Sequence, residues 1–145
     1  MTRVVLVSGG RAGFRQEIAV GPHRLHADEP REEGGSDIGP SPYELLLGSL
    51  GACTSMTLRM YADRKQWPLQ EVQVRLTFSQ IHAEDCLDCE TKQGMVNHIQ
   101  REISLVGDLS EEQRNRLLEI ADHCPVHRLL TSELKIDTRL AEPAT

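Results

Sequence analysis

The sequence feature that most constrains the fold is a long apolar segment, which we predict to be a helix from Ser41 to about Arg64. Its start, Ser-Pro-Tyr-Glu, offers a hydroxyl at the N-cap, a proline at the first helical position and an acid at the third, the pattern of a capping box. Residues 48–55 are dense in small side chains that allow another backbone to approach closely. Mostly apolar residues spread over more than half of the circumference, so the helix must be largely buried. They are Leu45, Leu46, Leu47, Leu50, Cys53, Met56, Thr57, Met60 and Tyr61.

Three strands and a loop are expected before this helix. Residues 2–8 are rich in β-branched types and end at a pair of glycines, which predicts a strand entering a turn. Strands at 14–20 and 23–27, separated by a Gly-Pro turn, would complete a meander. Residues 28–40 are charged, rich in glycine and proline and without periodicity, so we expect a surface loop there.

Two strands and two helices are expected after the long helix, with a last strand at the end. Alternating apolar residues predict strands at 71–81 and 98–106. Another capping box at Ser110 opens a helix that a proline ends, and 125–132 should form a second, short helix. A strand at 134–140 would give the order βββαββααβ, which predicts an α+β fold. Because so short a chain has little else to cover the long helix, we expect a homodimer.

Composition and charge limit the possible partners and location. The 145 residues are the common size of one domain, so we expect a single domain over 1–145. The net charge of -6 and the lack of basic runs argue against a nucleic-acid partner, because such proteins cluster lysine and arginine against phosphates. No stretch approaches the roughly 20 apolar residues of a membrane span, and the N-terminus does not read as a signal sequence. A cytoplasmic protein without a membrane partner is the expectation.

The four cysteines are the candidates for chemistry. In a reducing compartment each is interpreted as a buried small hydrophobe, a metal ligand or a redox thiol, rather than as part of a disulfide framework. A reactive thiol needs a cationic neighbour or a helix N-terminus that favours its thiolate. Cys124 lies at or near the N-cap of the short helix, beside His123 and His127. Cys53 is about three turns into the long helix, where the dipole has faded, so it would need an arginine from elsewhere.

Two motifs connect these cysteines with a known family. The first is GPSPYELLLGSLGAC, which ends at Cys53 and continues as TSMTLRMY, and the second is HCPVHR at 123–128. Together they resemble the OsmC/Ohr family of osmotically induced and organic hydroperoxide resistance proteins, over nearly the whole chain. The most specific part is a cysteine in a small-residue helix followed by a second roughly 70 residues later. The resemblance implies an OsmC-like, intertwined α+β homodimer with active sites at the interface and thiol-dependent reduction of organic hydroperoxides.

The resemblance also implies roles for the two cysteines and for two further residues. Cys53 matches the family's peroxide-attacking cysteine, and Cys124 matches the cysteine that resolves its sulfenic acid to a disulfide. The family holds the attacking thiolate with a glutamate early in the helix and an arginine from the N-terminal hairpin. The candidates here are Glu44 and Arg11.

Both supporting residues have competitors. Glu44 stands one position away from the family's glutamate position, which Tyr43 occupies, and one helical position is about 100° of rotation. Its interpretation as the capping-box acid stays open beside the catalytic one. Arg11 resembles the family's glycine-flanked arginine, whereas Arg15 and Arg24 are alternatives in the same hairpin.

The remaining cysteines, Cys86 and Cys89, form a Cys-x-x-Cys motif in a loop expected at 83–96. His82 and His98 flank it, and the four residues could complete a tetrahedral zinc site. Nearby acids would raise the thiol pKa values, which disfavours a fast redox dithiol. These acids are Glu84, Asp85, Asp88 and Glu90. A zinc site, a secondary redox pair and an ordinary acidic loop are the three interpretations.

The resemblance therefore implies a thiol-dependent peroxidase that reduces organic hydroperoxides through Cys53 and Cys124. An external dithiol would restore both thiols, and no cofactor is required. Two alternatives stay open. One is a zinc-binding protein in which Cys53 and Cys124 merely pack, and the other is a redox sensor of the same family without fast peroxidase turnover.

Overall fold

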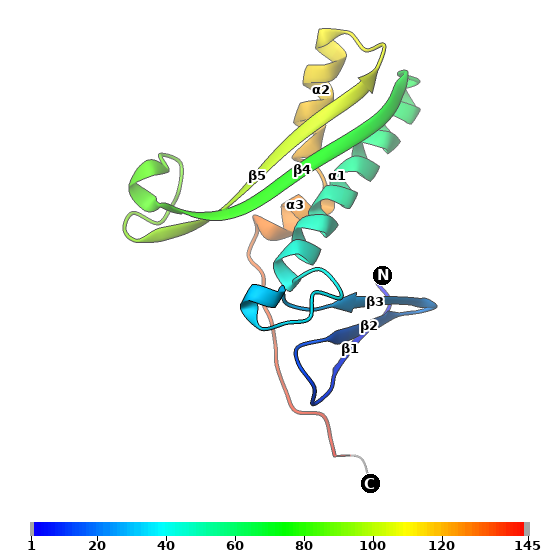
Figure 1. Cartoon of the computed structure of the whole chain (residues 1–145). Helices are drawn as coiled ribbons and strands as arrows, with labels where there is room; N and C mark the ends of the chain where they lie inside the picture. The colour runs from blue at the N-terminus through cyan, green and yellow to red at the C-terminus, as the bar shows by residue number, and fades with distance from the viewer. Residues whose placement is uncertain (1, 144–145) are drawn as a thin grey trace. The chain divides into compact units, whose positions relative to one another are not determined.

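The computed structural model describes residues 2–143, and Figure 1 shows the order of the helices and strands. They are β1 (Val5–Gly9), β2 (Gln16–Val20), β3 (His23–Ala27), the 3-10 helix η1 (Arg31–Glu33), α1 (Pro42–Lys65), β4 (Leu69–His82), the 3-10 helix η2 (Ala83–Asp85), β5 (Met95–Gly107), α2 (Glu111–Ala121) and α3 (Pro125–Leu130). One sheet has the strand order β1-β2-β3, with antiparallel neighbours, and the second joins β4 to β5. The fold is α+β with antiparallel sheets, as predicted.

The chain divides into two compact units, each built from two separate stretches of sequence. The first unit runs up to Gly51 and includes Arg75–Glu102, and the second contains Ala52–Val74 and the residues from Ile103 onward. The boundaries fall inside α1, β4 and β5 rather than in loops. The expectation of a single domain over 1–145 stays a prediction.

The three-stranded meander of the first unit agrees with the predicted strands. In the structure, β1 and β2 begin two to three residues later than predicted. The register pairs Val7 with Ile18 and Ile18 with Leu25, so apolar residues adjoin across the three strands. All five residues of β1 are exposed within the chain. Apolar residues are therefore exposed on both sides of β1, and no other segment of the described chain buries this strand.

Asp28 organises the loop after β3, a role that the sequence did not indicate. It is 2% exposed, and its Oδ1 accepts a hydrogen bond of 2.8 Å from the backbone N–H of Glu29. Its Oδ2 accepts from the N–H groups of Ser36 and Ile38 at 3.2 and 3.3 Å. Burial acts to raise the pKa of Asp28, but these hydrogen bonds and the charge of Arg15 outweigh it and hold the pKa below its usual value.

The second unit has a continuous apolar core to which both helices and both long strands contribute. Its buried members are Leu58, Ala62, Leu69, Leu109, Leu117, Ile120 and Ala121. The predicted capping box at Ser110 is present, because its hydroxyl accepts from the N–H of Gln113 and the Gln113 side chain accepts from the N–H of Ser110. This cap fixes where α2 begins and therefore which of its faces meets the core.

The long helix α1 is less buried than predicted. In the second unit Leu58 and Ala62 are fully buried, whereas Met56 and Met60 are 61% and 64% exposed. One chain therefore covers one side of this part of the helix and leaves Met56 and Met60 exposed, which corrects the expectation of a largely buried helix. Among residues 2–143, no helix combines the length and apolar character needed to cross a membrane.

The predicted strand at 134–140 is absent. The segment has no regular secondary structure, and Leu134, Ile136 and Leu140 are 56%, 76% and 96% exposed. The alternation of apolar residues that favoured a strand is real. A strand also needs a neighbouring backbone for its hydrogen bonds, and no segment within residues 2–143 pairs with this one.

Asp28→Asn should destabilise the protein at neutral pH, because the new amide group would place an N–H donor against backbone donors. The pKa of Asp28 is lower in the folded chain than the roughly 3.9 of an unfolded one, so its stabilisation is present above that value and is lost as the pH falls through the folded value. We expect a lower Tm near pH 7 and a flatter decline of Tm toward acidic pH. Thermal unfolding followed by circular dichroism measures both. Glu33→Gln, an exposed change in the same loop, is the control; equal effects of the two substitutions would contradict the role of Asp28.

Candidate active site

Cys53 and Cys124 lie in the second unit, on α1 and at the N-cap of α3. The placement of Cys124 follows from its neighbour. Pro125 disfavours helical geometry in the residue before it and suits the first position of a new helix, so α2 stops and α3 starts around Cys124. The backbone of Cys124 is accordingly extended, with φ -56° and ψ 130°. Both cysteines are free thiols.

The two predicted thiols lie near one another, and each shifts the pKa of the other. They differ in access to solvent. Cys124 is fully buried, whereas Cys53 is partly exposed. A molecule that approaches from solvent therefore meets the sulfur of Cys53 first.

The environment makes Cys124 the more acidic thiol of the pair. Burial acts to raise its pKa, but hydrogen bonds from the Cys53 thiol, from the N–H groups of His127 and Val126 and from Thr54 outweigh burial and lower it. Burial and the contact with Cys124 raise the pKa of Cys53, and the N–H of Val126 opposes this shift. The lower pKa thus belongs to Cys124, the residue to which the family resemblance gives the resolving step.

Two threonines also hydrogen-bond to the thiol pair. Their role was not predicted from the sequence. Thr57 lies one turn after Cys53 and hydrogen-bonds to it, which lowers the pKa of that thiol. Thr54 is fully buried and hydrogen-bonds to Cys124. The i, i+4 spacing of Cys53 and Thr57 is a signal that the sequence carries. The contact of Thr54 with Cys124 depends on how α1 packs.

Glu44 performs the local task that competed with its catalytic interpretation. Its Oε1 accepts a hydrogen bond of 2.8 Å from the N–H of Ser41, and its own N–H donates to the Ser41 hydroxyl at 3.3 Å. Hydrogen bonds to its carboxylate from the N–H and the side chain of Ser41 lower the pKa of Glu44. The neighbouring Tyr43 stacks on Phe78, with ring centroids 5.0 Å apart. The capping box predicted at the start of α1 is present, and a role of Glu44 toward Cys53 stays a prediction.

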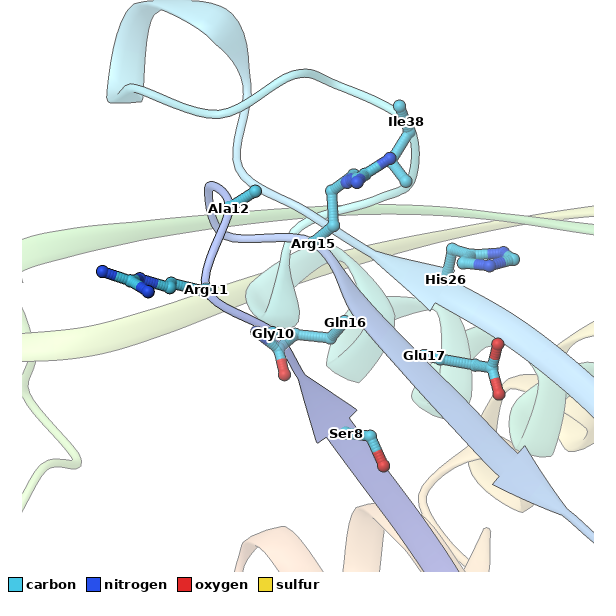
Figure 2. Close-up of a pocket in the computed structure, with 9 residues that line it drawn as sticks. All are labelled: Ser8, Gly10, Arg11, Ala12, Arg15, Gln16, Glu17, His26 and Ile38. Atoms are coloured by element: carbon cyan, nitrogen blue, oxygen red, sulfur yellow. The ribbon is translucent and has the colours of Figure 1, made fainter.

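The three candidate arginines, Arg11, Arg15 and Arg24, differ in the interactions that they make. Arg24 donates to the carbonyl oxygens of Gly21 and His23, both at 2.9 Å, so it stabilises the turn between β2 and β3. Arg15 acts on the buried Asp28. Arg11 has no hydrogen bond or ion pair within the described residues. Figure 2 shows Arg11 and Arg15 pointing in different directions from the loop between β1 and β2.

Arg11 and Arg15 both line a hollow of about 310 Å³ in the first unit. The remaining lining residues are Ser8, Gly10, Ala12, Gln16, Glu17, His26 and Ile38 (Figure 2). Of the three candidate arginines, Arg11 is thus the one with an uncommitted guanidinium. Its assignment to the thiolate of Cys53 stays a prediction.

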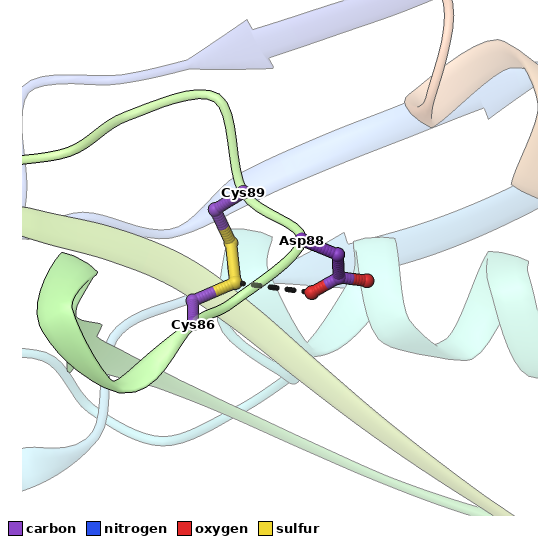
Figure 3. Close-up of side chains that lie close together, drawn as sticks. All are labelled: Cys86, Asp88 and Cys89. Atoms are coloured by element: carbon purple, nitrogen blue, oxygen red, sulfur yellow. Dashed lines mark hydrogen bonds between the residues drawn. A yellow bond between two sulfur atoms is a disulfide. The ribbon is translucent and has the colours of Figure 1, made fainter.

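Cys86 and Cys89, in the loop between β4 and β5, form a disulfide whose Cα atoms are 5.5 Å apart (Figure 3). The Oδ1 atom of Asp88 lies 3.4 Å from the sulfur of Cys86. The donor atoms of Cys86, Asp88 and Cys89 all lie within 4.8 Å of one another. His82 and His98 do not belong to this cluster, so in the described chain the predicted four-residue zinc set is not assembled.

Thr54→Val should move the first thiol ionisation to higher pH, because it removes a hydrogen bond that lowers the pKa of Cys124. The measurement is the pH dependence of each cysteine Cβ chemical shift, in a Cys86→Ser/Cys89→Ser background that leaves two thiols. In the parent, Cys124 should titrate at lower pH than Cys53. Thr57→Val is the matched variant, since it should instead raise the pKa of Cys53. A parent in which Cys53 ionises first would contradict the assignment.

Comparison with known proteins places this site in a family. A family model described as OsmC-like protein matches residues 34–139. No curated protein is significantly similar in sequence to this chain. Solved structures share the fold at low sequence identity, and three examples illustrate it.

The OsmC-like protein from Mycoplasma pneumoniae has a TM-score of 0.70 at 17% identity, over 90% of this chain and 87% of its own. The organic hydroperoxide resistance protein OsmC from Legionella pneumophila has a TM-score of 0.64 at 22% identity, over 90% of both chains. The organic hydroperoxide resistance protein OhrB of Bacillus subtilis has a TM-score of 0.60 at 19% identity, over 90% of this chain and 91% of its own. With a family model that matches most of its length, the chain belongs to the OsmC-like protein family.

Proposed function

We propose that this protein is a thiol-dependent peroxidase that reduces organic hydroperoxides with Cys53 and Cys124. The observation that carries the proposal is the proximity of the two thiols, which shift each other's pKa, one partly exposed and one fully buried. A sulfenic acid formed on one of them would have its resolving thiol already beside it. The hydroperoxide resistance proteins of Legionella pneumophila and Bacillus subtilis, which share the fold, support this substrate class.

Access and ionisation favour different sulfurs as the attacking atom. Peroxide from solvent reaches Cys53, but the lower pKa belongs to Cys124. A proton transfer between the two neighbouring thiols would resolve the conflict. When Cys124 is the thiolate, transfer of the Cys53 proton to it yields a thiolate on Cys53 and a thiol on Cys124, without any change in net charge.

The chemistry then balances in three steps. The Cys53 thiolate attacks one peroxide oxygen and the O–O bond breaks, which gives a sulfenic acid and, after protonation, an alcohol. The sulfur of Cys124 attacks that of Cys53, and water leaves as the disulfide forms. An external dithiol reduces the disulfide by exchange and is itself oxidised to a disulfide. No metal or organic cofactor is needed for these steps.

Because the pKa of Cys53 is raised, the proposed attack requires a further group that stabilises the Cys53 thiolate. A cation close to Cys53 would favour its thiolate and draw the proton toward Cys124. Arg11 is the proposed source, since it has no partner in the described chain. If Glu44 also helps to hold the Cys53 thiolate, it must do so while its carboxylate caps α1. Otherwise another residue performs the function of the family's glutamate.

We also propose that the protein acts as a homodimer. Met56 and Met60 are exposed on α1, and Leu134 and Ile136 are exposed in a segment with strand-like alternation. Apolar surface of this extent is unusual for a monomer and typical of an interface between subunits. A second copy would supply both a cover for α1 and a backbone to which residues 134–140 could hydrogen-bond.

Cys53→Ser should abolish dithiol-dependent consumption of an alkyl hydroperoxide, a loss of about 100-fold or more, since no other sulfur would be placed to attack. Cys124→Ser should retain one round of attack and accumulate sulfenic acid on Cys53, which a dimedone adduct located by mass spectrometry identifies. Cys86→Ser/Cys89→Ser is the control and should keep activity. Sulfenic acid trapped on Cys124 in Cys53→Ser would reverse the roles. Equal turnover by all variants would falsify the peroxidase proposal.

Met60→Glu should shift the protein from dimer to monomer, because it places a charge on an apolar interface. Sedimentation velocity measures the change. Glu112→Gln, on the exposed start of α2, is a surface control that should leave the dimer intact. A wild-type protein that sediments as a monomer would contradict the dimer.

A further inference from the structure

The loop between β4 and β5 holds a second pair of sulfur atoms that the proposed peroxidase does not use. Its base is fixed, because the N–H of Ala83 donates to the carbonyl of Gly94 at 2.8 Å and Ala83 is buried. The N–H of Cys86 donates to the carbonyl of Ala83 at 3.1 Å, and Lys92 Nζ donates to the carbonyl of Cys89 at 2.8 Å. These contacts hold the backbones of both cysteines within the loop independently of the disulfide between them.

We propose that this loop is a redox-gated zinc site, in which Cys86, Cys89 and Asp88 bind Zn²⁺ when the cysteines are reduced and release it when they form their disulfide. The donor atoms of the three residues already lie within 4.8 Å of one another. The Cys-x-x-Cys spacing is the one with which two thiolates commonly share a zinc ion.

In this proposal Asp88 is the third zinc ligand, instead of the histidines His82 and His98 predicted from the sequence. Its Oδ1 is 3.4 Å from the sulfur of Cys86, and Figure 3 shows its carboxylate directed toward that sulfur. Carboxylate oxygens are ordinary zinc ligands, and a site with three protein ligands leaves the fourth position to water. The additional acids in the loop, Glu84, Asp85 and Glu90, make its surroundings favourable to a cation.

The switch between the two states balances with ordinary thiol chemistry. An external dithiol donates two electrons and two protons to the Cys86–Cys89 disulfide, which becomes two thiols while the dithiol becomes a disulfide. Zn²⁺ then binds, and the two thiol protons pass to solvent. A small-molecule disulfide reverses the change: the two sulfurs give up two electrons, their disulfide forms again, two small thiols leave, and Zn²⁺ is released without a change in its own oxidation state.

The test measures zinc binding by equilibrium dialysis in a Cys53→Ser/Cys124→Ser background, so that the loop supplies the only thiols. After reduction with a phosphine that does not chelate metals, we expect about one zinc per chain. After treatment with excess cystamine we expect none. Asp88→Asn should weaken binding about tenfold or more. Asp85→Asn, a change of the same kind in the same loop, should keep the parental affinity.

The remaining variants decide between this ligand set and others. Cys86→Ser/Cys89→Ser should bind no zinc, and circular dichroism checks that it stays folded. His82→Ala/His98→Ala should bind as the parent does. A loss of binding in the histidine variant with none in Asp88→Asn would overturn the assignment of Asp88. Zinc retained after cystamine, or no zinc bound by the reduced parent, would overturn the gated site altogether.

Discussion

The packing of α1 against α2 is the constraint on which the second unit and its thiol pair depend. Leu58 and Ala62 of α1 are fully buried, as are Leu117 and Ala121 of α2. These four side chains belong to one buried apolar cluster to which both helices contribute. Thr54 lies one turn before Leu58 on the same side of α1, so this packing also delivers Thr54 and Cys53 to Cys124, three residues beyond Ala121. The site is thus a direct extension of the core.

Hydrogen bonds, rather than charged side chains, set the difference between the two sulfurs. Cys124 is surrounded by donors from its own turn and from α1, so its thiolate is stabilised although no water reaches it. Cys53 lacks an equivalent set and gives up its proton less readily.

The features that the sequence predicted well are those with local causes. The capping boxes at Ser41 and Ser110 and the break at Pro125 each depend on residues within four positions, so the ends of the helices could be predicted without a tertiary structure. The strand predicted at 134–140 does not form because pairing is not local: it needs a second backbone, which the described chain does not provide.

Local sequence thus determined the helix starts and the α+β class, because caps and periodicity act over a few residues or one turn. Only the tertiary structure decided which thiol ionises first, since the donors to Cys124 come from both α1 and the start of α3. It likewise decided that Asp28 anchors a loop and that Asp88, not a histidine, stands beside Cys86 and Cys89. Burial and contacts between distant segments are products of packing, and one strand or helix does not contain that information.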